Sequence, residues 1–179
     1  AHRQRTVLFG GENGAPLADT WEWDGAAWTQ VTPAGATPPA RYQHRMTYDA
    51  LRQRVVLFGG IDTTHTTLGD TWEWDGSDWV RTHESAPPPL VNGAMAFDEA
   101  RGNAVYFGGS DGDGRRYGTT WTLDAAGWAR RSEAGPSPRT SSAMGWDPDR
   151  GRVVLFGGGA GSWLDDTWLW DGSSWSAGP

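Results

Sequence analysis

Short apolar runs that end in two glycines recur along the chain, separated by longer polar segments. Each run starts with valine, passes through an apolar or aromatic residue to phenylalanine, and is as long as a single strand. A continuous apolar run bounded by glycine predicts a strand that is buried on both faces. The four runs occupy residues 7–11, 56–60, 105–109 and 154–158.

A second pattern follows each glycine pair and alternates with a period of two. It reads Thr-Trp-x-Trp-Asp in three repeats and Thr-Trp-Thr-Leu-Asp in the third, and another tryptophan stands four residues after each aspartate. The alternation predicts a strand, and the Asp-Gly or Ala-Gly pair before the last tryptophan predicts a hairpin turn into a further strand. Leu123 and Ala125 weaken this turn signal in the third repeat.

A third pattern, Met-x-aromatic-Asp, precedes three of the glycine pairs, at residues 46–49, 95–98 and 144–147. Equivalent residues stand 49 positions apart, and no segment shows the 3.6-residue period of a helix. A constant period near 50 residues is typical of β-propeller blades, each of which is one small sheet. The sequence therefore predicts an all-β propeller array built from four repeats.

The same period places the opening strand of the first repeat before Ala1. We therefore expect 15 strands in one array over residues 1–179, with blades at about 1–36, 37–86, 87–135 and 136–179. The first blade has three strands and the others have four. Because unpaired strand edges invite another chain, we expect a partial propeller. It is either part of a larger ring or completed by a homo-oligomer; closure of four blades alone is the third alternative.

Tryptophan and glycine are predicted to be structural. A blade cannot bury its own faces, so aromatic side chains of neighbouring blades are expected to fill the space between them. The glycine pairs are expected where a strand ends against another backbone or needs a positive φ. The residues concerned are Gly10, Gly11, Gly59, Gly60, Gly108, Gly109, Gly157, Gly158, Trp21, Trp28, Trp72, Trp79, Trp121, Trp128, Trp168 and Trp175.

Over nearly the whole chain, the glycine pair, the downstream aromatic pair and the closing tryptophan resemble the kelch repeat in its bacterial type. The resemblance implies a β-propeller that binds other proteins, since only a minority of kelch proteins carry oxidase or carbohydrate-related activities. The oxidases need a tyrosine cross-linked to cysteine. The chain has no cysteine, which excludes that chemistry as well as disulfides and thiolate metal sites.

Charge and hydropathy limit the partners. Lys plus Arg is 15 and Asp plus Glu is 22, which gives a net charge of −7 without any basic cluster. Nucleic acid and anionic membranes are therefore not expected as partners. No apolar run approaches the roughly 18 residues of a membrane span. We expect a soluble protein without a cofactor, located in the bacterial cytoplasm or secreted.

Recognition is expected on the loops between the second and third strands of each repeat, residues 12–18, 61–69, 110–118 and 159–165, because these vary while the frame stays constant. The resemblance implies that they open on the same face as the linkers that lead into the next repeat. The alternative is that they are only tolerant solvent loops. Candidate binding residues are Arg41, Tyr42, His65, Asn92, Arg115, Arg116, Tyr117, Arg139 and Trp163.

Two sets of candidates have explicit alternatives. The resemblance to kelch proteins that grip acidic peptides places Arg41 and Arg139 at the channel mouth, where a guanidinium can hold a carboxylate. Alternatively, each arginine pairs with a framework aspartate. Asp111 and Asp113 have a spacing that can offer oxygen ligands to Ca²⁺, but their loop lacks the later glutamate of an EF-hand. A glycine-rich turn is favoured there, and no metal is predicted.

These observations favour a non-catalytic scaffold that recognises a protein or peptide through loops on one face. The first alternative is a carbohydrate-binding propeller, in which Trp163, Tyr117 and Tyr42 stack on sugars. The second is an enzyme that uses paired acids, such as Asp111 and Asp113 or Asp165 and Asp166, although a framework role is favoured for the last two. The third is a structural protein, or a duplicated or designed propeller fragment, that oligomerises to close a ring.

Overall fold

The computed structural model describes residues 4–83 and 86–178, and every regular element in them is a strand. Fifteen strands form four antiparallel sheets, one of three strands and three of four, which confirms the sequence prediction. We call these sheets blades 1 to 4 in chain order. No helix able to cross a membrane occurs within the described ranges.

Blade 1 contains β1 (Thr6–Glu12), β2 (Pro16–Trp23) and β3 (Trp28–Val31). Blade 2 contains β4 (Arg45–Asp49), β5 (Arg54–Phe58), β6 (Thr71–Trp74) and β7 (Trp79–His83). Blade 3 contains β8 (Ala94–Asp98), β9 (Asn103–Phe107), β10 (Thr120–Asp124) and β11 (Gly127–Ser132). Blade 4 contains β12 (Ala143–Asp147), β13 (Arg152–Gly159), β14 (Trp163–Trp170) and β15 (Trp175–Ala177).

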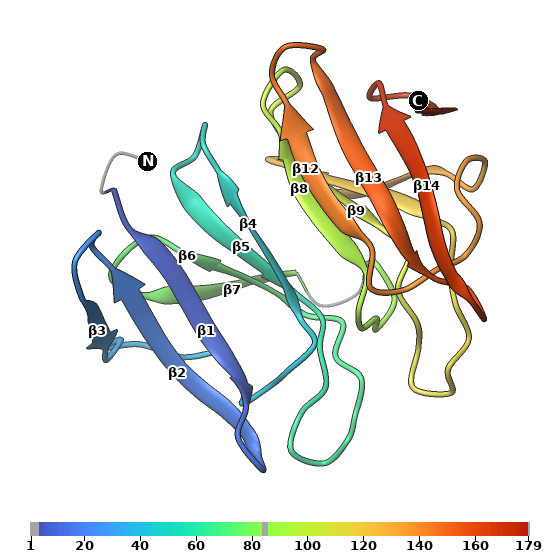
Figure 1. The fold of residues 1–179 in the computed structure, drawn as a ribbon. Helices are drawn as coiled ribbons and strands as arrows, with labels where there is room; N and C mark the ends of the chain where they lie inside the picture. Colours follow the sequence, from blue (N-terminus) through green and yellow to red (C-terminus); the bar gives the residue numbers. More distant parts are fainter. Residues whose placement is uncertain (1–3, 84–85, 179) are drawn as a thin grey trace.

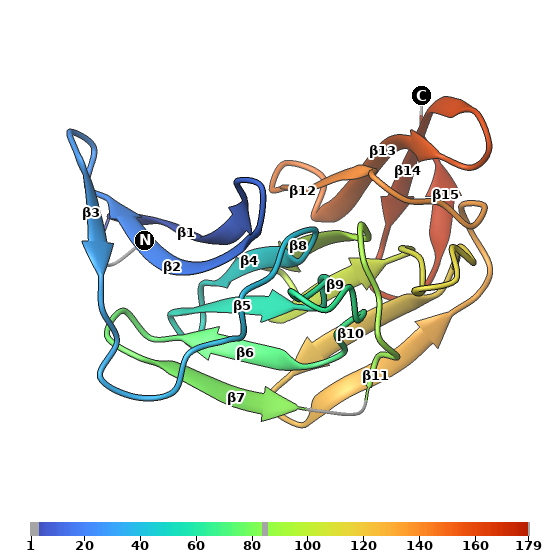
Figure 2. The same cartoon turned by 90° about the horizontal axis from the view of Figure 1, so that it is seen from below.

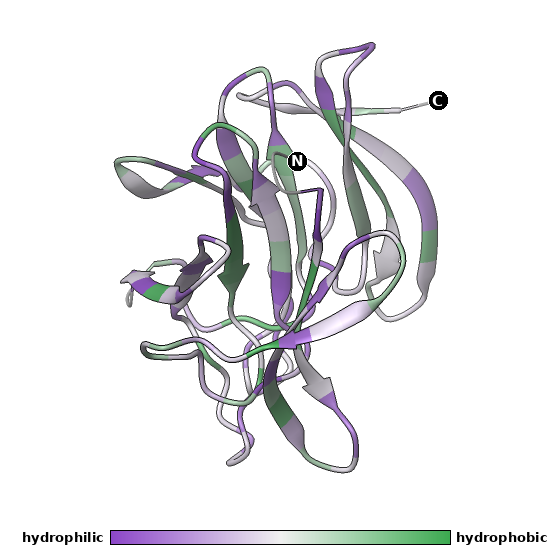
Figure 3. Cartoon of the chain, turned by 90° about the vertical axis from the view of Figure 1, so that its left-hand side faces the viewer, coloured by the Kyte–Doolittle hydropathy of each residue, from purple (hydrophilic) through white to green (hydrophobic). Residues whose placement is uncertain are grey.

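The blades fan around an axis instead of stacking as a sandwich. The first strands of blades 2, 3 and 4 are innermost, and β8 lies between β4 and β12 (Figure 2). The last strands, β3, β7, β11 and β15, lie on the outside (Figure 2). Hydrophobic stretches follow the strands and hydrophilic residues are frequent in the turns (Figure 3). The arrangement is that of an open, partial propeller.

Each junction between blades repeats one packing unit. Phe9 of blade 1 is 3% exposed and meets the ring of Trp79 from blade 2 edge-on, with ring centroids 5.2 Å apart. The same tryptophan donates its indole N–H to Thr20 Oγ1 at 2.9 Å. Equivalent bonds cross the other two junctions, from Trp128 to Thr71 and from Trp175 to Thr120. Trp79, Trp128 and Trp175 therefore lie as wedges between blades, whereas Trp28, for which the sequence predicts the same role, is 45% exposed.

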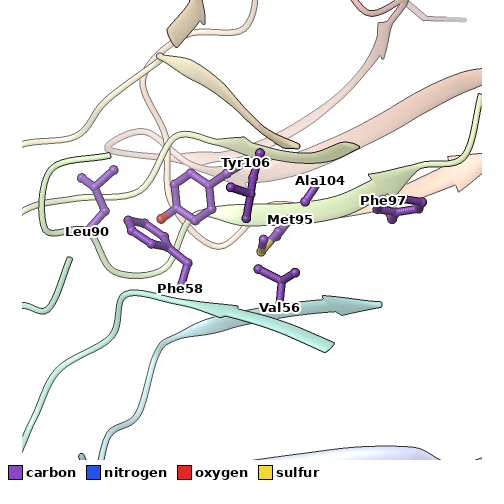
Figure 4. Packing of buried hydrophobic residues seen from close by; sticks show 8 residues of the cluster. Val56, Phe58, Leu90, Met95, Phe97, Ala104 and Tyr106 are labelled. Atoms are coloured by element: carbon purple, nitrogen blue, oxygen red, sulfur yellow. The ribbon is translucent and has the colours of Figure 1, made fainter. Parts of the chain in front are cut away.

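The third repeat replaces residues in a compensating way. Tyr106 stands where blades 2 and 4 have leucine, and Leu123 stands where they have tryptophan. Both are buried between blades 2 and 3 beside Val56 and Phe58 (Figure 4). A Cβ on Gly93 would lie 2.2 Å from the Tyr106 hydroxyl, so the glycine makes room for the larger ring.

The hairpin of the third repeat also forms, although its turn signal is weak. The glycine that follows the aspartate in the other repeats is replaced by Ala125, and Gly127 takes a positive φ of 109° two residues later. Asp124 pairs with Gly127, and Leu123 pairs with Trp128 across a turn of the same length as that between Trp74 and Trp79. A shifted glycine thus supplies the backbone freedom that the alanine lacks.

Candidate functional site

The variable loops and the inter-blade linkers meet at one end of the molecule, on the lower side of Figure 1. Isolated β-bridges join Tyr42 to Ile61 and Ile61 to Thr67 in blade 2. The corresponding bridges in the other two four-stranded blades involve Val91, Ser110 and Arg116, and Thr140 and Gly159. These bridges hold the loops and linkers together on one face, which we call the loop face.

The part of the loop face near the axis is fixed by hydrogen bonds between backbones. The N–H of Asn92 donates to the carbonyl of Gln43 at 3.1 Å, and the N–H of Ser141 donates to the carbonyl of Asn92 at 2.7 Å. Gln43, Asn92 and Ser141 have positive φ values of 59°, 54° and 59°, which are uncommon outside glycine. Tyr42 and Asn92 are half-buried here. Their side chains are therefore less accessible to a ligand than those of the exposed loop residues.

Two loops of the face are shaped by aspartates that accept bonds from their own backbone. Asp62 Oδ1 accepts from the N–H groups of Thr64 and Thr66 at 2.8 and 3.0 Å. Asp111 Oδ1 accepts from the N–H of Arg115 at 2.9 Å, and Asp111 Oδ2 accepts from the Tyr117 hydroxyl at 2.9 Å. Such bonds preorganise a loop, which reduces the entropy lost when a ligand binds.

The hydrogen bond to Asp111 changes the protonation chemistry of its partner. The pKa of Tyr117 is raised, first because its hydroxyl donates to Asp111 and then because of partial burial. The pKa of Asp111 is lowered; partial burial would raise it, but bonds from Tyr117, Arg115 and Asp113 outweigh that effect. At neutral pH the pair is a phenol bonded to a carboxylate.

The exposed side chains on this face include two arginines, a histidine and a tryptophan, beside the exposed acids Glu12, Asp113 and Asp165. His65, Arg115 and Arg116 are exposed, and the Arg115 guanidinium lies 5.3 Å from the centre of the Tyr117 ring. Trp163, at the tip of the β13–β14 hairpin of blade 4, is 82% exposed. Arginine and aromatic residues are the types that most often anchor a bound protein.

Arg41 and Arg139 do not line the loop face, which corrects the first of the two expectations for them. Arg41 is 0% exposed, and its Nη1 and Nη2 donate to the two oxygens of Asp70 at 2.7 and 2.8 Å. Arg139 is 2% exposed and donates in the same way to Asp166, with Nη2–Oδ2 at 2.8 Å. Both guanidiniums are thus committed to framework aspartates, the second expectation.

These arginines join neighbouring blades. The backbone of Arg41 accepts from the N–H of Gly11 in blade 1, while its side chain bonds to Asp70 and to the carbonyl of Gly59 in blade 2. The bidentate pair lowers the pKa of Asp166 to about 2. In blade 3 both partners change together, because Leu90 takes the place of the arginine and Thr119 that of the aspartate. We call the buried arginine–aspartate pairs of blades 2 and 4, Arg41–Asp70 and Arg139–Asp166, clasps. Blades 2 to 4 each carry both residues of a clasp or neither of them.

Asp111 and Asp113 act as parts of a turn. The Asp113 N–H donates to Asp111 Oδ1 at 3.1 Å, so the loop itself supplies donors to the carboxylate that Ca²⁺ would need. Within residues 4–83 and 86–178, no three side chains of the metal-binding types lie together. The backbone bonds to Asp111 Oδ1 are those of a glycine-rich turn.

His44 is a buried base that the sequence analysis did not single out. Burial, and then the nearby charges of Arg41 and Arg45, lower its pKa to about 4, whereas the unfolded chain has the ordinary value of 6.5. Its Nδ1 is buried without a hydrogen-bond partner. The folded protein therefore holds His44 neutral.

We expect the free energy of unfolding to decrease as the pH falls from about 6.5 to about 4, by roughly 2–3 kcal/mol, because only the unfolded chain takes up the proton over this interval. Urea denaturation at pH 7 and pH 4.5 measures the difference. His44→Ser, which copies Ser142 of blade 4, should flatten the dependence. The exposed-site control His65→Ser should leave it intact, and equal slopes in all three proteins would contradict the assignment.

Sequence reasoning left the pairing of each arginine with a framework aspartate as one of two alternatives, although a signal that favours it was present. The simultaneous change from Arg and Asp to Leu90 and Thr119 between repeats already indicated that the two positions touch. Sequence reasoning also placed four exposed residues in the segments between the second and third strands of their blades, where the structure has them: His65, Arg115, Arg116 and Trp163.

Comparison with known proteins agrees with this architecture. A family model described as the KLHDC2/KLHL20/DRC7 Kelch-repeats domain matches residues 1–177. A solved structure titled "Structure of YjhT" is similar with a TM-score of 0.67 and 13% identity, over 90% of this chain and 52% of that one. The chain thus spans about half the length of that structure. The search of curated proteins finds no match.

Proposed function

Because the chain belongs to the kelch-repeat family, we propose that it is a non-catalytic scaffold that binds a protein or peptide through its loop face. Kelch-repeat propellers are commonly protein-interaction scaffolds and are generally non-catalytic. The observation that supports the proposal most is the contrast between a frame that repeats every 49 residues and loops that differ from blade to blade.

The proposed anchors are arginine and aromatic side chains, which stand beside exposed acids on the same loops. His65 is exposed on the loop of blade 2 and Arg115 and Arg116 on the loop of blade 3, while the carboxylate of Asp111 accepts hydrogen bonds within its own loop. Gly112 and Thr67 bring these two loops together, since a Cβ on Gly112 would lie 3.1 Å from Thr67 Oγ1. Glycan recognition stays a prediction from the sequence.

A peptide-display selection against the immobilised chain tests the proposal. Tyr117→Ala, Trp163→Ala and Arg115→Ala are each expected to weaken the selected ligand at least about tenfold, because aromatic and arginine anchors carry most of the binding energy. Leu51→Ala is the matched control, since Leu51 is 69% exposed but lies in the β4–β5 turn, away from the loops. Unchanged affinity in all three loop variants would remove the proposed face.

A second candidate role is self-assembly. It is supported by the outer faces of blades 1 and 4, by which we mean the sheet faces that do not pack against a neighbouring blade. Leu8 and Trp28 are 44% and 45% exposed, and Phe156 is 52% exposed, whereas the equivalent Leu57, Trp79 and Phe58 are at most 2% exposed. Blade 4 of one copy offers blade 1 of a second copy the same apolar contacts that join blades 1 and 2. The outer faces are therefore complementary to each other.

We expect sedimentation equilibrium to detect association that strengthens with concentration. Phe156→Glu should abolish it, because a carboxylate would be buried against Trp28 of the second copy. Val80→Glu is the control, since Val80 is 55% exposed on an outer strand. A monomeric mass for the wild-type chain at high concentration would argue against this role.

A further inference from the structure

Two of the three asparagines in the chain are followed by glycine. Asn13 precedes Gly14 and Asn92 precedes Gly93, whereas Asn103 precedes an alanine. The backbone nitrogen of the following residue can attack the amide carbon of an asparagine side chain, and glycine permits this best because no Cβ stands beside that nitrogen. The two Asn-Gly pairs have the same local sequence, so the fold decides which of them reacts.

The first pair lies at the tip of the β1–β2 hairpin, on the loop face (Figure 1). Asn13, Gly14 and Ala15 form the turn, and the pairing of Glu12 with Pro16 closes it. All three turn residues are exposed, and nothing lies within 4 Å of the position of a Cβ on Gly14. The tip therefore leaves room for the Asn13 side chain to turn onto the Gly14 nitrogen.

The turn does not use the side chain of Asn13. It is stabilised by a backbone bond from the Asn13 N–H to the Ala15 carbonyl at 3.1 Å. Blade 4 forms the same turn with alanine in place of asparagine, since the Ala160 N–H donates to the Ser162 carbonyl at 3.0 Å. Among the residues that the structure describes, no hydrogen bond holds the Asn13 side chain or the Gly14 N–H. The reaction at Asn13 thus breaks no bond that the hairpin needs.

The second pair has a fixed backbone. The Asn92 N–H donates to the carbonyl of Gln43 at 3.1 Å, and the Asn92 carbonyl accepts from the N–H of Ser141 at 2.7 Å. Gly93 is buried, and its carbonyl accepts from Arg45 Nε. Ring closure at Asn92 would have to rotate peptide groups that these bonds hold in place.

Asn103 is protected by a strand. It begins β9, pairs with Asp98 of β8, and has a buried Oδ1. The next residue, Ala104, is 2% exposed and belongs to the core between blades 2 and 3. Reaction at Asn103 would therefore require blade 3 to open.

We propose that Asn13 is a site of spontaneous deamidation, at which the loop face gains a carboxylate. The Gly14 nitrogen forms a bond to Cγ of Asn13, and the bond from Cγ to the side-chain nitrogen breaks. That nitrogen leaves as ammonia with the proton of the Gly14 N–H. Water then opens the resulting five-membered imide at either carbonyl. The product is an aspartate linked to Gly14 through its α- or its β-carboxyl group.

Both products change the loop face. One amide becomes one carboxylate, so the formal net charge of −7 becomes more negative by one. The new charge stands beside the exposed side chain of Glu12, and like charges repel each other. The β-linked product also adds a methylene group to the main chain of the hairpin. The change needs no ligand, so it goes beyond the binding role proposed for this face.

Tryptic peptides of the whole chain separate the three sites. The chain has no lysine, and cleavage after arginine places Asn13, Asn92 and Asn103 in peptides 6–41, 82–101 and 102–115. The folded chain is incubated at neutral pH, and mass spectrometry follows the conversion of each asparagine to aspartate, with a sample digested at time zero as the blank. Asn13 is expected to convert at least about tenfold faster than Asn92, because a fixed backbone keeps the reacting atoms of Asn92 apart.

Unfolding and substitution test whether the fold makes this difference. In concentrated urea, Asn13 and Asn92 are expected to convert at similar rates, because the bonds to Gln43 and Ser141 are lost. Anion exchange of the folded wild-type chain should show a more acidic species that grows with time. Asn13→Ala, which copies Ala160, should fold and lack this species.

Equal rates at Asn13 and Asn92 in the folded chain would overturn the proposal, as would faster conversion at Asn92. An acidic species that Asn13→Ala retains would also overturn it. So would conversion of Asn13 that proceeds in urea but not in the folded chain, since the hairpin would then protect the pair. The incubation contains no ligand, so its outcome is independent of the loop-face experiment.

Discussion

Replacement of Arg41 by alanine is expected to lower the free energy of unfolding by about 3–5 kcal/mol, because it leaves the carboxylate of Asp70 buried without its partner. The side chains of Arg41 and Asp70 are 0% and 6% exposed, so water cannot replace the lost guanidinium. The pKa of Asp70 is lowered in the folded protein; burial would raise it, but Arg41 outweighs that effect. Urea denaturation at pH 7 measures the loss.

Two controls separate the clasp from a general effect of arginine removal. The double variant Arg41→Leu with Asp70→Thr copies Leu90 and Thr119, and should recover most of the lost stability because neither position then carries a buried charge. Arg150→Ala breaks the ion pair between Arg150 and Asp147, in which the arginine side chain is 69% exposed. It should lower the free energy of unfolding by less than about 1 kcal/mol. A double variant as unstable as the single one would refute the clasp.

The repeat predicted the fold because each of its positions has one physical role in every blade. At the junctions of blades 1 and 2 and of blades 3 and 4, a valine and a phenylalanine of one blade meet two tryptophans of the next, as Phe9 and Trp79 do, and Leu123 replaces one tryptophan at the junction between them. Period, strand number and wedge residues therefore follow from self-comparison alone. The glycine shift from position 125 to Gly127 was not foreseen, because a turn can gain its positive φ at more than one place.

The roles of the charged residues were harder to predict, since they depend on which neighbours the fold brings close. Arg41 and Arg116 are both arginines at the loop end of a blade, yet one is fully buried and the other is exposed. An aspartate 29 residues from Arg41 distinguishes them, and in the sequence only the joint change to Leu90 and Thr119 points to the contact between Arg41 and Asp70. His44 is similar, because its lowered pKa arises from burial that no local pattern reports.

Removal of the wedge at the junction of blades 1 and 2 should be as damaging as breaking the clasp. Trp79→Ala is expected to lower the free energy of unfolding by about 3–5 kcal/mol. Trp79 is 2% exposed, packs against Phe9 and Trp74, and donates to Thr20 Oγ1, so the variant creates a cavity and leaves the buried hydroxyl without this donor.

Trp28→Ala is the matched control, because Trp28 has the same place in the repeat but is 45% exposed on the outer face of blade 1. It contacts Trp23, with ring centroids 5.7 Å apart, and its loss should cost only about 1 kcal/mol at dilutions where the chain is monomeric. Urea denaturation of both variants gives the comparison. Equal losses would mean that tryptophan stabilises its own hairpin rather than the junction, since only the junction distinguishes Trp79 from Trp28.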